Sequence, residues 1–272
     1  MSDMSHIILR DLRVQTPEGG LQVRRWQHRD GRAQARAPIV LLHDSLGCIA
    51  VWRDFPERLA VATGREIIAY DRLGFGQSDP HPHRLSGDFI HAEARDGFGH
   101  VRAALSLDAF IAFGHSVGGG MAVACAAQYP DACRALITVS AQAFVEDRTL
   151  AGIRAAQKAY AQPALRERLA RYHGDKTGWV LSAWIDSWLA PTFADWCLDD
   201  DLRGVMCPVL AIHGALDEFG SAAHPARIAD LSKGPATVQL MEGTGHMPHR
   251  EQPERTMTLI SQWFAELAPD RA

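Results

Sequence analysis

A serine between two glycines, directly after a short apolar stretch, is the feature that most constrains how this chain can fold. The pentapeptide Gly114-His115-Ser116-Val117-Gly118 follows the apolar residues 109–113. A short apolar run that ends at glycine is typical of a buried strand. Glycine on both sides of the serine permits a tight turn in which larger side chains would collide with the neighbouring strand and helix. The pattern predicts a strand, a sharp turn and a helix, with the hydroxyl of Ser116 raised clear of a sheet.

Two titratable residues follow predicted strands further along the chain. Asp217 comes shortly after the apolar run 208–212, and His246 follows the strand predicted at 238–241. A serine hydroxyl is a weak nucleophile until a base accepts its proton. Histidine suits that task because its ordinary pKa is about 6.5, and a buried carboxylate fixes the histidine tautomer. The spacing indicates Ser116 as nucleophile, His246 as general base and Asp217 as the orienting acid.

Two upstream loops complete the pattern. The apolar run 38–42 leads into His43-Asp44-Ser45-Leu46-Gly47, and the run 65–69 leads into the loop 70–79, Tyr-Asp-Arg-Leu-Gly-Phe-Gly-Gln-Ser-Asp. These loops are similar to the His-Gly-x-x-Gly and Asp-x-x-Gly-x-Gly-x-Ser loops of α/β-hydrolases, in which the order Ser, Asp, His also occurs. From residue 38 to about residue 250, the chain resembles an α/β-hydrolase of the serine esterase and C–C-bond hydrolase branch.

The resemblance implies an oxyanion hole formed by the backbone N–H groups of Ser45 and Val117. Donors of this kind contribute about 3 to 4 kcal/mol each in a site with little water. The chain departs from the family pattern at Asp44, where glycine is usual. A carboxylate beside a developing oxyanion would oppose it unless the side chain is paired or points away. Ser116 stands where haloalkane dehalogenases and epoxide hydrolases carry aspartate, which disfavours those two reactions.

The orienting acid has two competing positions. Glu218 directly follows Asp217, but the family pattern His-Gly-x-x-Asp at 213–217 selects Asp217. An acid after the strand predicted to end near residue 140 would be the other family position. Residues 140–143 read Ser-Ala-Gln-Ala and carry no carboxylate, which favours Asp217.

Composition and charge indicate an ordinary globular protein. Of 272 residues, 47% are hydrophobic and 22% charged, and the formal net charge of −4 argues against a nucleic-acid partner. The first six residues lack a basic and apolar leader, and no apolar run approaches the ~20 residues that span a bilayer. Five scattered cysteines predict buried, reduced thiols. We therefore expect a cytoplasmic protein without a membrane partner. Short basic groups at 24–25 and 166–171 are interpreted as solvated faces.

Apolar segments alternate with helical patterns along most of the chain. This alternation predicts an α/β fold with a mostly parallel sheet covered by helices on both faces. A hairpin is expected over residues 6–30 and a terminal helix over 252–268. Parallel strands are expected near 39–43, 65–70, 108–115, 134–140, 208–213 and 236–241.

The alternation is interrupted between residues 143 and 204, where helical patterns occur without a strand. α/β-Hydrolases insert a helical cap at this position, so the resemblance implies a core of 1–142 and 205–272 and a cap of 143–204. Four of the seven tryptophans lie in this segment. Most should pack the cap, and a few should line an apolar pocket. The candidate pocket residues are His115, Trp184, Trp188 and Met247.

The hypothesis that follows is a cofactor-independent serine hydrolase acting on a small, largely apolar or aromatic ester through an acyl-enzyme. Thioester hydrolysis and perhydrolysis by the same triad stay open. Further alternatives are a C–C-bond hydrolase of meta-cleavage type, a cofactor-free oxygenase that uses a His–Asp dyad, and a ligand receptor on the same scaffold. C–C-bond hydrolases often carry Trp after the catalytic histidine, where this chain has Met247. The two histidines His81 and His83 lack partners for metal binding, so no metal is expected. The partner expected is a small-molecule substrate, and the oligomeric state, including a homo-oligomer, stays open.

Overall fold

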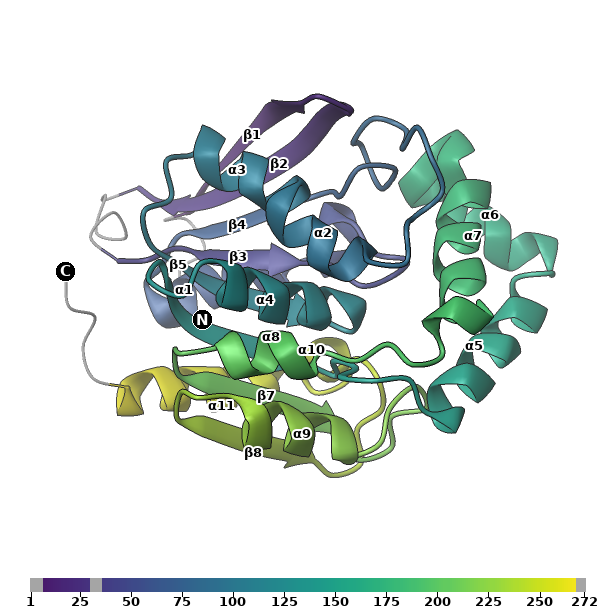
Figure 1. The fold of residues 1–272 in the computed structure, drawn as a ribbon. Helices are drawn as coiled ribbons and strands as arrows, with labels where there is room; N and C mark the ends of the chain where they lie inside the picture. Colours follow the sequence, from purple (N-terminus) through teal and green to yellow (C-terminus); the bar gives the residue numbers. More distant parts are fainter. Residues whose placement is uncertain (1–6, 30–35, 268–272) are drawn as a thin grey trace.

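The computed structural model describes residues 7–29 and 36–267, whose strands form one eight-stranded sheet (Figure 1). Its strand order is β1-β2-β4-β3-β5-β6-β7-β8. The first pair is an antiparallel hairpin, and β2 joins the rest of the sheet by antiparallel pairing with β4. All the later neighbours pair in parallel. The strands are β1 (Ile7–Thr16), β2 (Gly19–His28), β3 (Ile39–Leu42), β4 (Ile67–Tyr70), β5 (Phe110–His115), β6 (Cys133–Val139), β7 (Val209–Gly214) and β8 (Ala236–Met241).

The sheet is buried on both faces at its centre. Every residue of β3, β4, β5 and β7 is buried, whereas β8 at the edge alternates between exposed and partly buried positions before its buried last residue. Continuous apolar strands of this kind are typical of a parallel sheet covered on both sides. Because the side chains of a strand alternate between faces, Val40 and Leu42 join one apolar core, and Ile39 and Leu41 join the other.

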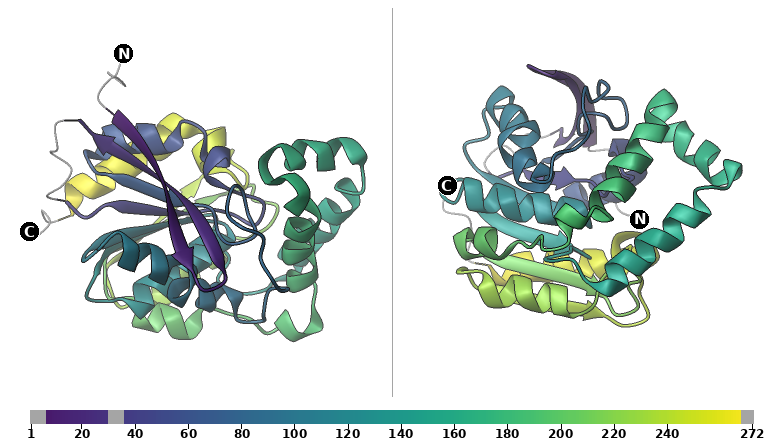
Figure 2. Two further views of the ribbon diagram at one scale, coloured as in Figure 1. Left: turned by 90° about the horizontal axis from the view of Figure 1, so that it is seen from above. Right: turned by 45° about the vertical axis from the view of Figure 1, so that its right-hand side comes forward.

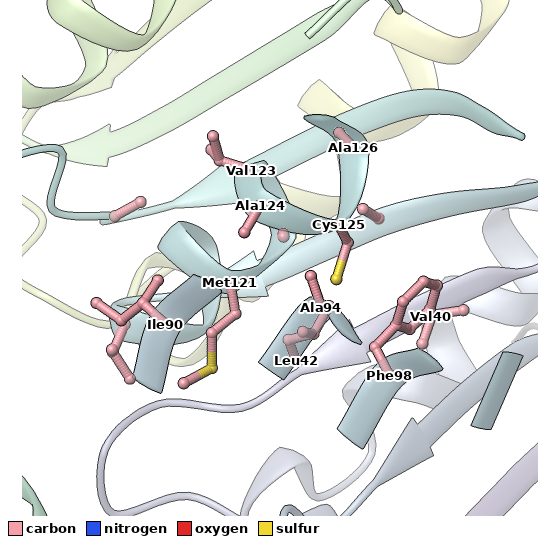
Figure 3. Packing of buried hydrophobic residues seen from close by; sticks show 14 of the residues in the cluster. Val40, Leu42, Ile90, Ala94, Phe98, Met121, Val123, Ala124, Cys125 and Ala126 are labelled. Atoms are coloured by element: carbon pink, nitrogen blue, oxygen red, sulfur yellow. The ribbon is translucent and has the colours of Figure 1, made fainter. Parts of the chain in front are cut away.

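Two layers of helices cover these faces. Seen from above, α1 and α11 lie on one side of the sheet and α2, α3 and α4 on the other (Figure 2). In the first core, Met121 and Cys125 of α4 pack near Ile90 and Phe98 (Figure 3). The helices are α1 (Phe55–Thr63), α2 (Phe89–Arg95), α3 (Gly97–Ala104), α4 (Val117–Gln128), α8 (Asp199–Gly204), α9 (Ala223–Leu231), α10 (Pro248–Glu251) and α11 (Pro253–Glu266).

Three further helices lie together at one side of the sheet, between β6 and β7 in the sequence (Figure 1). They are α5 (Asp147–Ala159), α6 (Pro163–His173) and α7 (Thr177–Trp188), with short 3-10 turns at Gly174–Lys176 and Pro191–Phe193. The following helix, α8, packs against α4 of the layered core. These helices occupy the stretch in which the sequence predicts a cap.

The predicted α/β architecture is confirmed, and each predicted strand has its counterpart. The terminal helix ends at Glu266, and the ends of the expected hairpin and the leader region 1–6 lie outside the described residues. One expectation for the thiols is wrong: Cys197 is exposed, because it lies in the loop before α8, while the other four are buried. Among the described helices, none is both long enough and apolar enough to cross a membrane.

Candidate active site

Ser116 lies in the turn between β5 and α4, in a strained backbone conformation. Its φ of 56° and ψ of −128° place a residue with a side chain in a region that favours glycine. The Ser116 N–H donates to the carbonyl of Val139 at 2.9 Å, and its carbonyl accepts from the N–H of Gly119 at 2.8 Å. These bonds tie the turn to β6 and to the first turn of α4. They hold the hydroxyl at the carboxyl edge of the sheet.

The flanking glycines are required by close backbone contacts. A Cβ atom at Gly114 would lie 2.0 Å from the carbonyl oxygen of Gly118, and one at Gly118 would lie 2.2 Å from that of Leu42. Both distances are far inside van der Waals contact. The glycines thus let β3, the turn and α4 approach one another, as the sequence pattern predicts.

The pairing of β7 with β8 brings Asp217 and His246 together. His246 Nδ1 lies 2.9 Å from both carboxylate oxygens of Asp217, which also accepts the N–H of Phe219 at 2.7 Å. Burial raises the pKa of Asp217, but the hydrogen bond and charge of His246 outweigh it and hold that pKa below its ordinary value. An ionised carboxylate accepts hydrogen bonds and cannot donate them, so Nδ1 carries the proton. In the neutral form of the ring, this tautomer leaves the lone pair on Nε2, where a general base needs it.

Ser116 and His246 line one cavity, yet no hydrogen bond joins their side chains in the described part of the chain. The serine hydroxyl instead faces Gln142 Oε1 at 3.5 Å, a long contact. Hydrogen bonds between catalytic groups are often loose before substrate binds. Sequence reasoning considered residues 140–143 solely for the missing carboxylate and so missed Gln142 as a neighbour of the hydroxyl.

Two backbone amides, those of Ser45 and Val117, have no hydrogen-bond acceptor in the described structure. Ser45 lines the same cavity, and Val117 directly follows the serine at the first position of α4. Within the described residues, neither N–H group donates to a protein acceptor. Buried amides almost always have partners, so free donors beside Ser116 are the feature expected of an oxyanion hole.

Asp44, the residue that departs from the family pattern, is paired. Its Oδ1 accepts the N–H of Leu46 at 2.8 Å, and its Oδ2 lies 3.3 Å from His115 Nδ1. The other ring nitrogen of His115 donates to the carbonyl of His246 at 2.9 Å. Burial acts to raise the pKa of Asp44, but the hydrogen bond and charge of His115 lower it well below its ordinary value. Both oxygens of the carboxylate thus have a hydrogen-bond partner.

Hydrogen bonds from His43 and Arg72 fix the loop that carries Asp44. The carbonyl of Asp44 accepts Nη2 of Arg72 at 3.0 Å and Nδ1 of His43 at 2.8 Å. His43 Nε2 in turn accepts the N–H of Arg72 at 3.1 Å. Burial lowers the pKa of His43 well below its ordinary value, which keeps this ring neutral. His43 and Arg72 therefore hold the loop.

A cavity of about 460 Å³ opens above Ser116 and His246, between the sheet edge and helices α5 to α7. Trp184, Trp188 and Met247, three of the candidate pocket residues, line it. His115 does not reach it, because the ring is buried below the turn with both nitrogens engaged by Asp44 and the His246 carbonyl. Arginines also line the cavity, which the sequence interpretation of solvated faces did not anticipate. No group of three or more His, Cys, Asp or Glu side chains in the described residues is placed to hold a metal ion.

Comparison with known proteins places the chain in a family. The sequence profile of the α/β-hydrolase fold family matches residues 37–196. A human protein named 1-acylglycerol-3-phosphate O-acyltransferase ABHD5 is 32% identical over 117 residues, which are 43% of this chain and 33% of that relative. The mouse serine hydrolase BPHL is 27% identical over 65% of this chain and 62% of its own length. The chain thus spans a third of the first of these relatives and under two thirds of the second.

Solved structures share the fold at low sequence identity. A 2-hydroxy-6-oxo-6-phenylhexa-2,4-dienoate hydrolase from Rhodococcus sp. strain RHA1 superposes with a TM-score of 0.78 at 15% identity, over 95% of this chain and 99% of that one. The carboxylesterase CesB of Bacillus subtilis gives a TM-score of 0.70 at 18% identity, over 97% and 94%. With a family profile that matches more than half of its length, a Ser-Asp-His order and this layered sheet, the chain belongs to the α/β-hydrolase fold family.

Proposed function

We propose that the protein is a serine hydrolase that cleaves a carboxylic ester, or a related acyl compound, through an acyl-enzyme. The observation that carries the proposal is the pairing of His246 with Asp217, because His246 lines one cavity together with Ser116 and with Ser45, whose backbone amide is free in the described structure. Family membership supports hydrolysis as the reaction class. The curated serine hydrolase relative from mouse agrees with it.

In the proposed reaction, Ser116 Oγ attacks the acyl carbon while His246 Nε2 accepts the hydroxyl proton. The carbonyl oxygen becomes an oxyanion, which the N–H groups of Ser45 and Val117 stabilise. The C–O bond to the leaving group breaks, and His246 returns the proton to the departing alcohol. His246 then takes a proton from water, whose oxygen attacks the acyl-enzyme. The bond from the acyl carbon to Ser116 Oγ breaks, His246 returns the proton to Oγ, and the acid is released. Asp217 keeps His246 in the required tautomer throughout.

The cavity lining favours an apolar or aromatic part in the substrate. Ile153, Leu169, Trp184, Trp188 and Phe219 supply apolar walls from the inserted helices and the loop after β7. A pocket of this size and composition fits a small ligand. We propose that helices α5 to α7 act as a cap that shapes this pocket and limits the access of water to the acyl-enzyme.

Kinetics with short p-nitrophenyl esters test the proposal. We expect turnover by the wild-type protein and a loss of at least about a thousandfold in kcat for Ser116→Ala, because the step that forms the acyl-enzyme is removed. Thr258→Ala, an exposed change on α11 outside the cavity lining, is the control and should keep most of the activity. A loss of less than about tenfold in Ser116→Ala contradicts a nucleophilic serine.

The same pair of variants separates the competing reactions. Full turnover in Ser116→Ala, with loss in His246→Ala and consumption of oxygen, would identify a cofactor-free oxygenase. Cleavage of a vinylogous 1,5-diketone, without cleavage of esters, would identify a C–C-bond hydrolase. Met247 follows His246 where such hydrolases often carry tryptophan, so we rank this reaction below ester hydrolysis.

A further inference from the structure

The cavity above Ser116 carries an excess of positive charge. Four arginines line it: Arg53, Arg168, Arg171 and Arg250. Of the described residues, the carboxylate in this lining is that of Asp44, and its oxygens already face His115 and the N–H of Leu46. A cavity for a wholly apolar ester has no need of four guanidinium groups. The imbalance therefore points to a negatively charged ligand.

Arg250 is the most buried of the four and is incompletely bonded. It lies on α10, just after His246, and donates to the carbonyl of Val51 at 3.1 Å and to the sulfur of Met247 at 3.4 Å. Its Nε is buried, and in the described structure that atom has no hydrogen-bond partner. Burial lowers the pKa of Arg250, and the charge of Arg53 lowers it further.

Arg53 is held at the cavity by a strained backbone. It follows the 3-10 turn Ile49–Trp52, with a φ of 55° and a ψ of −123°. This conformation costs a residue with a side chain about 1 to 3 kcal/mol, and Ser116 adopts nearly the same one. The turn that positions Arg53 contains Val51, whose carbonyl accepts from Arg250. Within the described residues, the ion pairs between arginine and a carboxylate involve other arginines than these two.

Resting on the proposed function, we propose that Arg53 and Arg250 form an anion subsite that binds a carboxylate or phosphate group carried by the ester substrate. Guanidinium groups suit this role because their planar N–H donors match the oxygens of both anions. Arg168 and Arg171 of α6 add positive charge to the same cavity lining. The substrate is then an ester with an apolar middle and an anionic end, its acyl carbon at Ser116.

Paired substrates of equal length test this subsite. The charged probes are p-nitrophenyl monoesters of glutarate, adipate and suberate, and a p-nitrophenyl ester with a terminal phosphate. The matched neutral probes are the same esters with the far carboxylate capped as a methyl ester. We expect kcat/KM of the wild-type protein to be at least about tenfold higher for a charged probe than for its neutral match. The preference should shrink as salt screens the charge. The probe with the largest ratio identifies the acyl chain length and the anionic group, carboxylate or phosphate, that the subsite prefers.

Variants connect that preference with the two arginines. Arg53→Gln and Arg250→Gln should each lower kcat/KM for the charged ester by about ten- to a hundredfold, mainly through KM, and change it less than about threefold for the neutral ester. Arg250→Lys keeps the charge and should recover part of the loss. Arg166→Gln, on α6 but outside the cavity lining, is the matched control. Arg53 makes no hydrogen bond through its side chain within the described residues, so its variant tests the idea even if Arg250→Gln fails to fold.

The outcomes separate this subsite from the reaction itself. Equal rates for charged and neutral esters, both lost in Ser116→Ala, overturn the anion subsite and leave the hydrolase intact. If no ester is turned over, calorimetric titration with monomethyl adipate and with inorganic phosphate tests the subsite alone. Binding by the wild type that Arg53→Gln abolishes supports it, and absence of binding by the wild type overturns it.

Discussion

Replacement of Glu93 by glutamine should stabilise the protein at alkaline pH. Glu93 lies on α2, partly buried, and accepts a hydrogen bond of 2.7 Å from the Tyr70 hydroxyl. Burial raises the pKa of Glu93 to about 7, although the charge of Arg72 and the Tyr70 hydrogen bond act in the opposite direction. In an unfolded chain the same carboxyl has a pKa of about 4.3. Between these values the folded protein keeps a proton that the unfolded chain releases, so stability falls as the pH rises.

The size of the effect follows from the two pKa values. One pKa unit corresponds to about 1.4 kcal/mol, so the difference between the two pKa values corresponds to about 4 kcal/mol above pH 7. Solvent reaches part of the side chain, which reduces the expected value to about 2 kcal/mol. Glutamine keeps an oxygen that can accept from Tyr70. Glu93→Gln should therefore exceed the wild type by about 2 kcal/mol in free energy of unfolding at pH 8 and nearly equal it at pH 4.5.

Urea denaturation at the two pH values measures this difference. Glu167→Gln, an exposed position on α6, is the control and should leave the unfolding free energy unchanged at both. A gap between Glu93→Gln and the wild type that is the same at pH 4.5 and pH 8 would refute the reasoning. So would a variant that is less stable than the wild type at pH 8.

Three further substitutions test the site. In Asp217→Asn the amide can donate to His246 Nδ1 and move the ring proton to Nε2. The kcat for ester hydrolysis should therefore fall by about three to four orders of magnitude. A loss of less than tenfold would count against the role of Asp217. Asp44→Asn removes the charge paired with His115 and should lower the free energy of unfolding at pH 7 by about 1 to 3 kcal/mol. An unchanged midpoint in urea denaturation would mean that this pair does not stabilise the loop. A methyl group at Gly118 would clash with the backbone of β3. Gly118→Ala should therefore lose more than about 3 kcal/mol in free energy of unfolding or fail to fold. A thermal midpoint equal to that of the wild type would contradict this close contact.

The parts of the site that could be predicted from the sequence are those whose position depends on strand order. Ser116, Asp217 and His246 each follow a strand, and parallel strands end at one edge of the sheet, so their loops meet there. The flanking glycines and the loop after β3 could be predicted for the same reason. Identification of the elements therefore sufficed to bring these residues together.

The parts that could not be predicted depend on the direction of side chains. His115 was expected at the pocket, but its ring turns below the sheet edge, where Asp44 and the His246 carbonyl engage both nitrogens. Arg53 and Arg250 are far apart in sequence, yet Arg250 donates to the carbonyl of Val51, two residues before Arg53. No local pattern contains that contact. The sequence around Arg53 likewise does not predict the strained backbone conformation of this residue.

Labelling with a fluorophosphonate probe tests the central claim most directly, because the probe reacts with a serine that a neighbouring base has activated. We expect one adduct on the intact protein, mapped by peptide mass spectrometry to Ser116, absent in Ser116→Ala and strongly slowed in His246→Ala. A wild-type protein that stays unlabelled, or an adduct on another residue, would contradict the assignment of Ser116 as the activated nucleophile.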